Sequence, residues 1–151
     1  GGGDWLEEPL NRYDYRGYAR LRGESPVRIA GGEFTDSVHE LRELLRHNAL
    51  DVVQPDCAIA CGLGQAKSIA DQAERQGIEY TPHSWTNGLG VAANLHVAAA
   101  THPDWFEYPY EPPFTPEGRD FLLGAPVGHE DGNVTPPDGP GLGVEIDREH
   151  L

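Results

Sequence analysis

The sequence predicts an α/β fold in which parallel strands alternate with crossover helices. Segments of strand length and segments with helical spacing follow one another five times within 151 residues. An ionisable residue also stands at the end of each expected strand, which packing alone does not predict. Barrels of the (β/α)₈ type build their active sites from such strand ends, whereas open doubly wound sheets bind ligands mainly at one switch point. The pattern therefore favours part of a TIM-type (β/α) barrel.

The expected strands are short apolar runs bounded by Pro, Gly or Asp. The run DVVQP, for example, ends at Pro55, and VRIAGG ends in two glycines. The five expected strands are residues 3–9, 27–32, 51–55, 78–82 and 105–109.

The expected helices show apolar residues three and four positions apart. The clearest signal is Val38, Leu41, Leu44 and Leu45, after a capping Asp36 or Ser37. Thr115 with Pro116 is a typical helix start. The five expected helices are residues 12–22, 36–49, 62–77, 88–100 and 115–123, and the turn-rich tail carries one or two short strands.

A closed barrel needs eight strands and about 250 residues. Five units are about five-eighths of that number, so we expect residues 1–123 to be the C-terminal half of a modified barrel. We expect the first barrel strands to lie outside this chain. An open sheet exposes raw edges, so the chain alone should be unstable or form a homo-oligomer.

The ionisable strand-end residues are separated by 26, 23, 27 and 24 positions, one strand–helix unit each time; they are Glu7, Glu33, Asp56, His83 and Glu107. Neighbouring parallel strands lie about 5 Å apart. Carboxylates on two such ends can hold one Mg²⁺, which prefers hard oxygen ligands. We therefore expect Glu7 and Glu33 to be metal ligands.

The remaining three positions fit proton transfer. An imidazole titrates near neutrality and can act as a base, so His83 is the candidate base. Asp56, one strand earlier, can accept from the other ring nitrogen. A carboxyl whose pKa is raised by burial can donate a hydrogen bond to an enolate, a role that suits Glu107.

Several strings resemble one known family. They are WLEEP, IAGGE, DVVQPD with CGLG, TPHSW with NGLGVAANLH, FEYP and PDGPGLGVEID, in this order from Trp5 to about Ile146. Together they resemble the enolase superfamily, in its mandelate racemase and muconate lactonizing enzyme branch. The resemblance implies a modified TIM barrel, and a capping domain built from an N-terminal portion outside this chain and from the tail, here residues 124–151.

The resemblance also implies site roles. Glu7 and Glu33 match two of three Mg²⁺ ligands, Asp56 and His83 match a hydrogen-bonded base pair, and Glu107 matches the group that faces the enolate. The third ligand and a lysine-based second base belong to earlier strands. The single lysine, Lys67, falls on an expected helix after the third strand and cannot fill that role.

Other interpretations of these residues stay open. Asp56 could cap the following turn, and His83 could bind zinc with Cys57 and Cys61, although C-x-x-x-C is not a usual zinc spacing. Glu8 should point away from Glu7 by strand alternation, toward a helix. Trp85 and Asn87 could contact substrate or pack.

Composition excludes several classes of function. A formal charge of −14 disfavours nucleic-acid binding. No apolar run of about 18 residues occurs, so we expect no membrane span. With two cysteines and no visible secretory signal, we expect a cytoplasmic protein with reduced thiols.

The resulting expectation is Mg²⁺-dependent abstraction of the proton alpha to a carboxylate through a metal-stabilised enolate. Dehydration of an acid sugar is the first choice, with a racemase or epimerase of a 2-hydroxy acid as the alternative. The ligand would be a small-molecule carboxylate. A rival expectation is a catalytically inactive barrel half, which pairs with the N-terminal half of the same protein or with a separate complementary chain.

Overall fold

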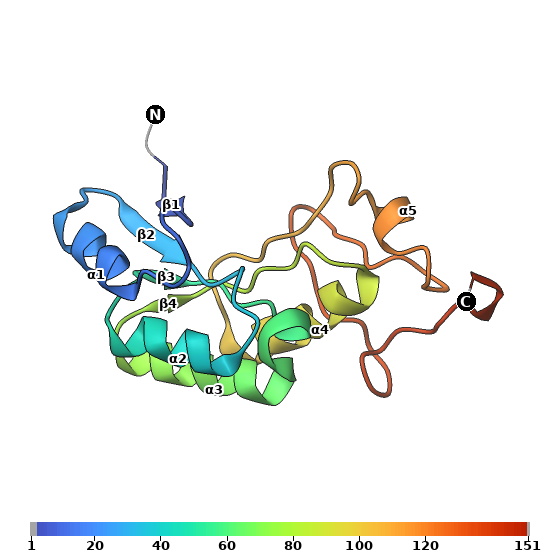
Figure 1. Cartoon of the computed structure of the whole chain (residues 1–151). Helices are drawn as coiled ribbons and strands as arrows, with labels where there is room; N and C mark the ends of the chain where they lie inside the picture. The colour runs from blue at the N-terminus through green and yellow to red at the C-terminus, as the bar shows by residue number, and fades with distance from the viewer. Residues whose placement is uncertain (1–2, 151) are drawn as a thin grey trace.

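The computed structural model describes residues 3–150, and residues 1, 2 and 151 of the expected barrel half and tail lie outside it. Four strands form one parallel sheet in the order β1-β2-β3-β4 (Figure 1). Their bounds are Trp5–Glu7, Arg28–Gly31, Val52–Val53 and Glu79–Tyr80. The α-helices are α1 (Tyr15–Glu24), α2 (Val38–Arg46), α3 (Gly62–Arg75), α4 (Gly88–Thr101) and α5 (Pro116–Arg119), with a π-helix η1 (Cys57–Cys61) and a 3₁₀ helix η2 (Arg148–His150).

The register brings the strand ends to one edge of the sheet. Glu7 of β1 lies opposite Ala30 of β2, and Val53 of β3 lies opposite Tyr80 of β4. Because all four strands run in the same direction, whatever follows each of them emerges on the same side. The expected parallel α/β architecture is confirmed.

Local sequence explains where the helices begin. Four of the five α-helices start at a side chain that accepts a backbone N–H of the first turn, as N-cap residues do, and Thr115 is the cap of α5. Asp14 caps α1, Ser37 caps α2 and Asn87 caps α4. Asn87 therefore has a capping role, and α1 begins three residues later than expected because its cap is Asp14.

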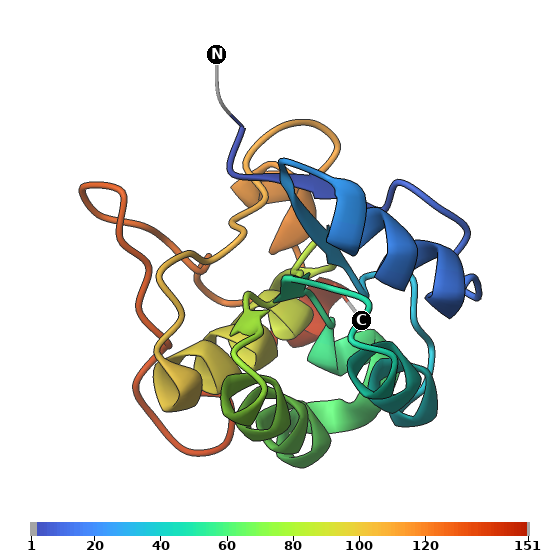
Figure 2. The same ribbon diagram turned by 90° about the vertical axis from the view of Figure 1, so that its left-hand side faces the viewer.

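The helices lie around the outside of the strands, as in a barrel wall (Figure 2). Helix α2 buries Leu41, Leu44 and Leu45, the stripe that the sequence indicates. Helix α4 is apolar on most of its surface, so it is buried between α3, η1 and the tail. No helix within residues 3–150 is both long and apolar enough to span a bilayer.

The C-terminal third differs from the expectation. Residues 105–109 form no strand; Pro103 and Pro109 bound the segment and lack the N–H that a ladder needs. Its Phe106 packs instead in a cluster with Leu95 of α4 and the tail. Helix α5 has four residues rather than nine, and the described tail has two isolated bridges, Leu123–Ile146 and Glu130–Asn133, rather than strands.

Candidate active site

The carboxylates of Glu7 and Glu33 lie side by side at the ends of β1 and β2. Glu7 Oε2 accepts hydrogen bonds from Trp5 Nε1 at 3.2 Å and from Gln54 Nε2 at 3.1 Å. Burial and the neighbouring Glu7 carboxyl raise the pKa of Glu33 to about 7, against the opposing effect of His83. Two carboxylates crowded in this way favour a bound cation over two separate charges.

The residue after β1 turns away from this pair. Glu8 has a positive φ of 43°. Its carboxylate accepts from Tyr18 Oη and from the N–H of Gly32, each at 2.6 Å. Glu8 therefore joins β1 to α1 and β2, in agreement with its expected helix-facing role.

Asp56 follows β3 and is fully buried. Its Oδ1 accepts from the N–H of Ala58 at 2.8 Å, which caps η1, and from Asn94 Nδ2 at 2.9 Å. The capping role and the contact with His83 coexist, because each uses a different oxygen of the carboxylate.

His83, after β4, is the centre of the cluster. Its Nδ1 lies 3.4 Å from Asp56 Oδ2, and its Nε2 lies 3.3 Å from Glu33 Oε2 and 3.9 Å from Glu107 Oε2. Burial of the ring disfavours its charged form, but the interaction with Asp56 and the negative charges of Glu107 and Glu33 outweigh this effect and raise the pKa of His83. The structure thus brings the four residues together, and Glu7 joins them through Glu33.

Glu107 reaches the cluster from the irregular segment 105–109. Burial raises the pKa of its carboxyl, although His83 and a hydrogen bond from Trp85 oppose the shift. The Trp85 ring packs edge-on against Phe114, with the centroids 5.3 Å apart. Trp85 therefore has a structural contact on one side and contacts a candidate site residue on the other.

The zinc alternative is not supported. Both ring nitrogens of His83 face carboxylates, Asp56 on one side and Glu33 and Glu107 on the other. Cys57 is buried, and burial raises the pKa of its thiol to about 12. Over the described part of the chain, no three His, Cys, Asp or Glu side chains converge as a complete metal site. Glu7 and Glu33 fit Mg²⁺ by donor type and by the cause of the Glu33 pKa shift, and they would hold it together with further ligands.

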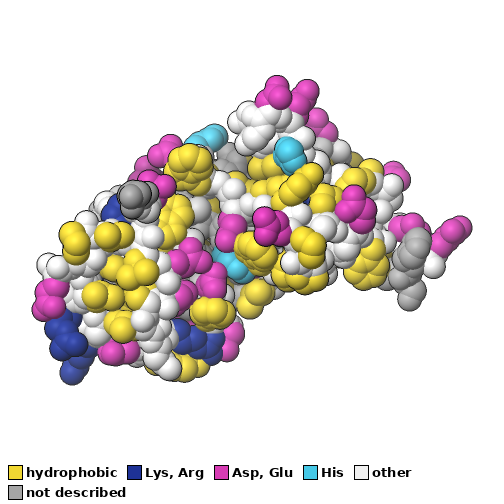
Figure 3. All heavy atoms as spheres, turned by 90° about the horizontal axis from the view of Figure 1, so that it is seen from above, with side chains coloured by type: hydrophobic (Ala, Val, Ile, Leu, Met, Phe, Trp, Pro, Cys, Tyr) yellow, Lys and Arg dark blue, Asp and Glu magenta, His cyan; other side chains and the backbone are white. Residues whose placement is uncertain are grey.

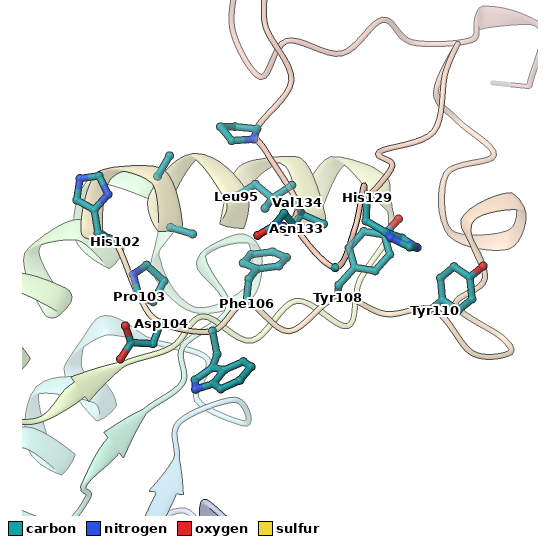
Figure 4. Close-up of a pocket in the computed structure, with 15 residues that line it drawn as sticks. Leu95, His102, Pro103, Asp104, Phe106, Tyr108, Tyr110, His129, Asn133 and Val134 are labelled. Atoms are coloured by element: carbon teal, nitrogen blue, oxygen red, sulfur yellow. The ribbon is translucent and has the colours of Figure 1, made fainter.

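Two cavities lie near this region. One of about 260 Å³ is lined by Glu7, Gln54, Trp105 and Glu107, among others, and opens beside the carboxylates. Viewed from above, acidic side chains gather near the middle of the molecule, next to a histidine (Figure 3). The other cavity, of about 650 Å³, lies between α4 and the tail and contains no candidate site residue; the labelled rings of Phe106, Tyr108 and Tyr110 line it (Figure 4).

Sequence reasoning missed two polar contacts of the cluster. Gln54 donates to Glu7, and Asn94 donates to Asp56. Asn94 stands in a mostly apolar helix, and a polar residue between Ala93 and Leu95 was the available signal. Gln54 had no signal of its own, because it lies within an expected strand.

Comparisons with known proteins agree with this architecture. Residues 2–150 match the family model described as "Enolase C-terminal domain-like". The chain is 37% identical to D-galactarolactone cycloisomerase from Agrobacterium fabrum and 34% identical to arabinonate dehydratase from Saccharolobus solfataricus, over 98% and 95% of its length. It covers 41% and 38% of those two proteins.

Solved structures give the same result. The chain superposes with a TM-score of 0.85 on a mandelate racemase/muconate lactonizing enzyme-like protein from Roseovarius sp. TM1035, at 30% identity, over 97% of this chain and 36% of the other. With 3,6-anhydro-D-galactonate cycloisomerase from Zobellia galactanivorans, the TM-score is 0.81 and the identity 30%, over 97% and 41%.

The fold and the site together define a class of protein. The chain is part of an α/β barrel, and it carries acidic and imidazole side chains at its strand ends. The chain belongs to the enolase superfamily, as a C-terminal domain of the mandelate racemase/muconate lactonizing enzyme type. It spans about two fifths of the length of the curated relatives named above.

Proposed function

We propose that this chain is the part of an acid-sugar dehydratase that carries its proton-transfer residues. The observation that carries the proposal is the His83 ring, with Asp56 at 3.4 Å from one nitrogen and Glu33 and Glu107 at 3.3 and 3.9 Å from the other. The names of relatives support the substrate class, since they include an arabinonate dehydratase and D-galactonate dehydratases.

His83 Nε2 is the proposed base. Asp56 faces Nδ1, so a proton on Nδ1 is favoured and the Nε2 lone pair is left for the proton alpha to the substrate carboxylate. Asp56 also stabilises the imidazolium that forms, since its buried charge lies next to the ring. The raised pKa of His83 means that the ring holds the abstracted proton well.

Glu7 and Glu33 would hold a Mg²⁺ ion with a third ligand from outside this chain. Such an ion supplies Lewis-acid stabilisation of the negative charge on the substrate carboxylate oxygens. Their own contribution is two carboxylates already placed beside each other, of which Glu7 is held by Trp5 and Gln54, so little rearrangement is needed.

Glu107 is the proposed donor to the enolate oxygen. Its raised pKa keeps a larger share of the carboxyl protonated, and only the protonated form can donate. Dehydration then breaks the bond between the β-carbon and its hydroxyl oxygen. The departing oxygen takes the proton from His83, water leaves, and the enol product becomes a 2-keto-3-deoxy acid.

A cycloisomerase is the second candidate, because the relative at 37% identity bears that name. A cycloisomerase and a dehydratase would share the abstraction of the α-proton. The two reactions differ in the bond that changes after this step. A racemase needs a second proton-carrying group on the opposite face of the substrate. Lys67 does not provide one, since it lies on α3 and pairs with Asp71. We also propose that residues 1–151 need the rest of the barrel for activity.

The test uses the complete protein that carries this chain, with Mg²⁺ and a panel of aldonates and aldarates in D₂O. We expect a 2-keto-3-deoxy product, detected by NMR, and no exchange of the α-proton in the variant His83→Asn. His39→Asn, an exposed histidine on α2, is the matched control. Full exchange in His83→Asn would remove His83 as the base, and a lactone or an epimer as sole product would refute dehydration.

A further inference from the structure

A buried amide of helix α4 contacts the residue that faces His83. Asn94 is fully buried. Its Nδ2 donates to Asp56 Oδ1 at 2.9 Å and to the carbonyl of Gly90 at 3.1 Å. Its Oδ1 accepts the backbone N–H of Cys57 at 2.9 Å. The amide nitrogen therefore bonds to Asp56, and the amide oxygen bonds to the backbone of the next residue, Cys57.

These contacts give the two oxygens of Asp56 different surroundings. Oδ1 receives two N–H donors, one from Asn94 and one from Ala58. Oδ2 has no hydrogen-bond partner among residues 3–150 and faces His83 Nδ1. A carboxylate with one oxygen held by two donors cannot rotate freely, so the second oxygen stays directed at the ring.

We propose that Asn94 is a positioning residue of this site. It fixes the rotation of Asp56 and thereby favours the His83 tautomer that carries its proton on Nδ1. In that tautomer Nε2, which faces Glu33 and Glu107, carries no proton. The importance of that tautomer for catalysis rests on the proposed function, in which Nε2 is the base. The tautomer itself is a property of the resting protein and can be measured without a substrate.

A purely structural role is the alternative. Asn94 also satisfies the buried N–H of Cys57, and an unpaired buried donor is costly. If the amide served only to pair that N–H, its removal would lower the stability of η1 and leave the His83 tautomer unchanged. The cap of η1 does not depend on Asn94, because the Asp56 side chain itself caps η1 by accepting the N–H of Ala58. The tautomer therefore separates the two roles.

The experiment labels histidine ring nitrogens with ¹⁵N in the complete protein that carries this chain, without substrate, and measures two-bond ¹H–¹⁵N correlations at a pH where the rings are neutral. The variant His83→Asn assigns the signal. We expect His83 to carry its proton on Nδ1 and the Nδ1–H to Nε2–H ratio to fall about fivefold in Asn94→Ala, the equivalent of one hydrogen bond. Asp56→Asn should lower the ratio at least as much.

Two controls separate positioning from packing. Val97→Ala removes buried volume from the same helix and should leave the ratio unchanged. If Asn94 acts through Asp56, then adding Asn94→Ala to Asp56→Asn should change the ratio no further. In the complete protein, Asn94→Ala should lower kcat for α-proton exchange about tenfold to a hundredfold, the range for a lost outer partner of a site residue, with little change in KM.

Three results would overturn the proposal. They are an unchanged ratio in folded Asn94→Ala, an equal fall in Val97→Ala, or a further fall in the double variant. If Asn94→Ala does not fold, the milder Asn94→Ser is measured, and loss of folding in both variants would assign Asn94 to structure alone. A shifted tautomer in a protein without exchange activity would support the positioning role and refute the proposed function.

Discussion

His83 Nδ1 lies 3.4 Å from Asp56 Oδ2, and neither atom has another hydrogen-bond partner within residues 3–150. The separation is slightly longer than the usual 2.7–3.2 Å for such a pair. Catalytic contacts are often long in a resting enzyme and shorten when substrate binds. Because both atoms are buried and otherwise unpaired, each is the nearest available partner of the other, which makes Asp56 the first residue to test.

Asp56→Asn should lower the rate of α-proton exchange in the complete protein about a hundredfold or more, the scale of general-base catalysis. The amide has no charge to stabilise the imidazolium, and its NH₂ group can favour the wrong tautomer. KM should change little, because Asp56 is buried beneath the ring. Exchange rates by NMR in D₂O check this, with Asp71→Asn, at a half-exposed carboxylate of α3, as control. A variant with exchange near the wild-type rate would contradict the orienting role.

The convergence of the five candidate residues could be predicted from the sequence. In a parallel sheet, the strand period alone places Glu7, Glu33, Asp56 and His83 at one edge, and the structure brings these side chains together. Glu107 joins them although its segment is not a strand. Its segment packs through Phe106 against the cluster that contains Leu95, without a ladder. The expected proximity of Glu107 to His83 is therefore met although the expected strand is absent.

The contacts that orient the site could not be predicted. Asn94 meets Asp56 across 38 positions of sequence, a distance set by how α4 packs on η1. The π-helix η1 was expected to be a turn, because the five residues CAIAC carry no periodic signal. Helix packing and irregular turns depend on tertiary contacts, and a pattern of strands and helices does not contain them.

Mg²⁺ should bind the complete protein through Glu7 and Glu33. Either Glu7→Gln or Glu33→Gln should weaken binding at least about tenfold, because each removes one charged oxygen ligand. Isothermal titration with MgCl₂ measures this. Glu43→Gln, which alters a half-exposed carboxylate on α2, should bind as the wild type does. Wild-type affinity in Glu33→Gln would exclude Glu33 as a ligand.

The same binding should depend on pH in a defined direction. Burial raises the pKa of Glu33 to about 7, so below that pH the carboxyl is mostly protonated and must release its proton before it binds a cation. Affinity should therefore rise by up to about tenfold per pH unit below pH 7 and level off above it. Titrations in buffers of different ionisation enthalpy count the released proton. In Glu33→Gln this part of the pH dependence should disappear.

Tyr18→Phe should destabilise the chain by about 1.5–3 kcal/mol, the range for a hydrogen bond to a charged group. Tyr18 is buried, and its Oη donates to Glu8 Oε2 at 2.6 Å. The variant leaves the Glu8 carboxylate with one partner fewer beside β2. Urea unfolding followed by circular dichroism measures the loss. Tyr110→Phe, at an exposed ring, should change the unfolding free energy by less than about 0.5 kcal/mol, and equal losses in both variants would refute the role of Glu8.

Asp51 should make stability depend on acid pH. Burial alone would raise the pKa of Asp51, but hydrogen bonds from Arg22 Nε at 2.7 Å and from the N–H of Ile29 at 2.9 Å outweigh it and lower the pKa. A lowered pKa in the folded state means that the unfolded chain binds the proton more readily. This contribution is complete above the ordinary aspartate value of about 4 and is lost as the pH falls through the folded-state pKa.

Asp51→Asn should therefore be less stable than the wild type at pH 7, and the difference should shrink between about pH 4 and pH 2. Urea unfolding at a series of pH values measures both chains. Asp71→Asn is the matched control, because it removes a half-exposed ion pair with Lys67, and such pairs contribute at most about 1 kcal/mol. A stability difference that stays constant across the acid range would show that Asp51 acts through packing rather than through its charge.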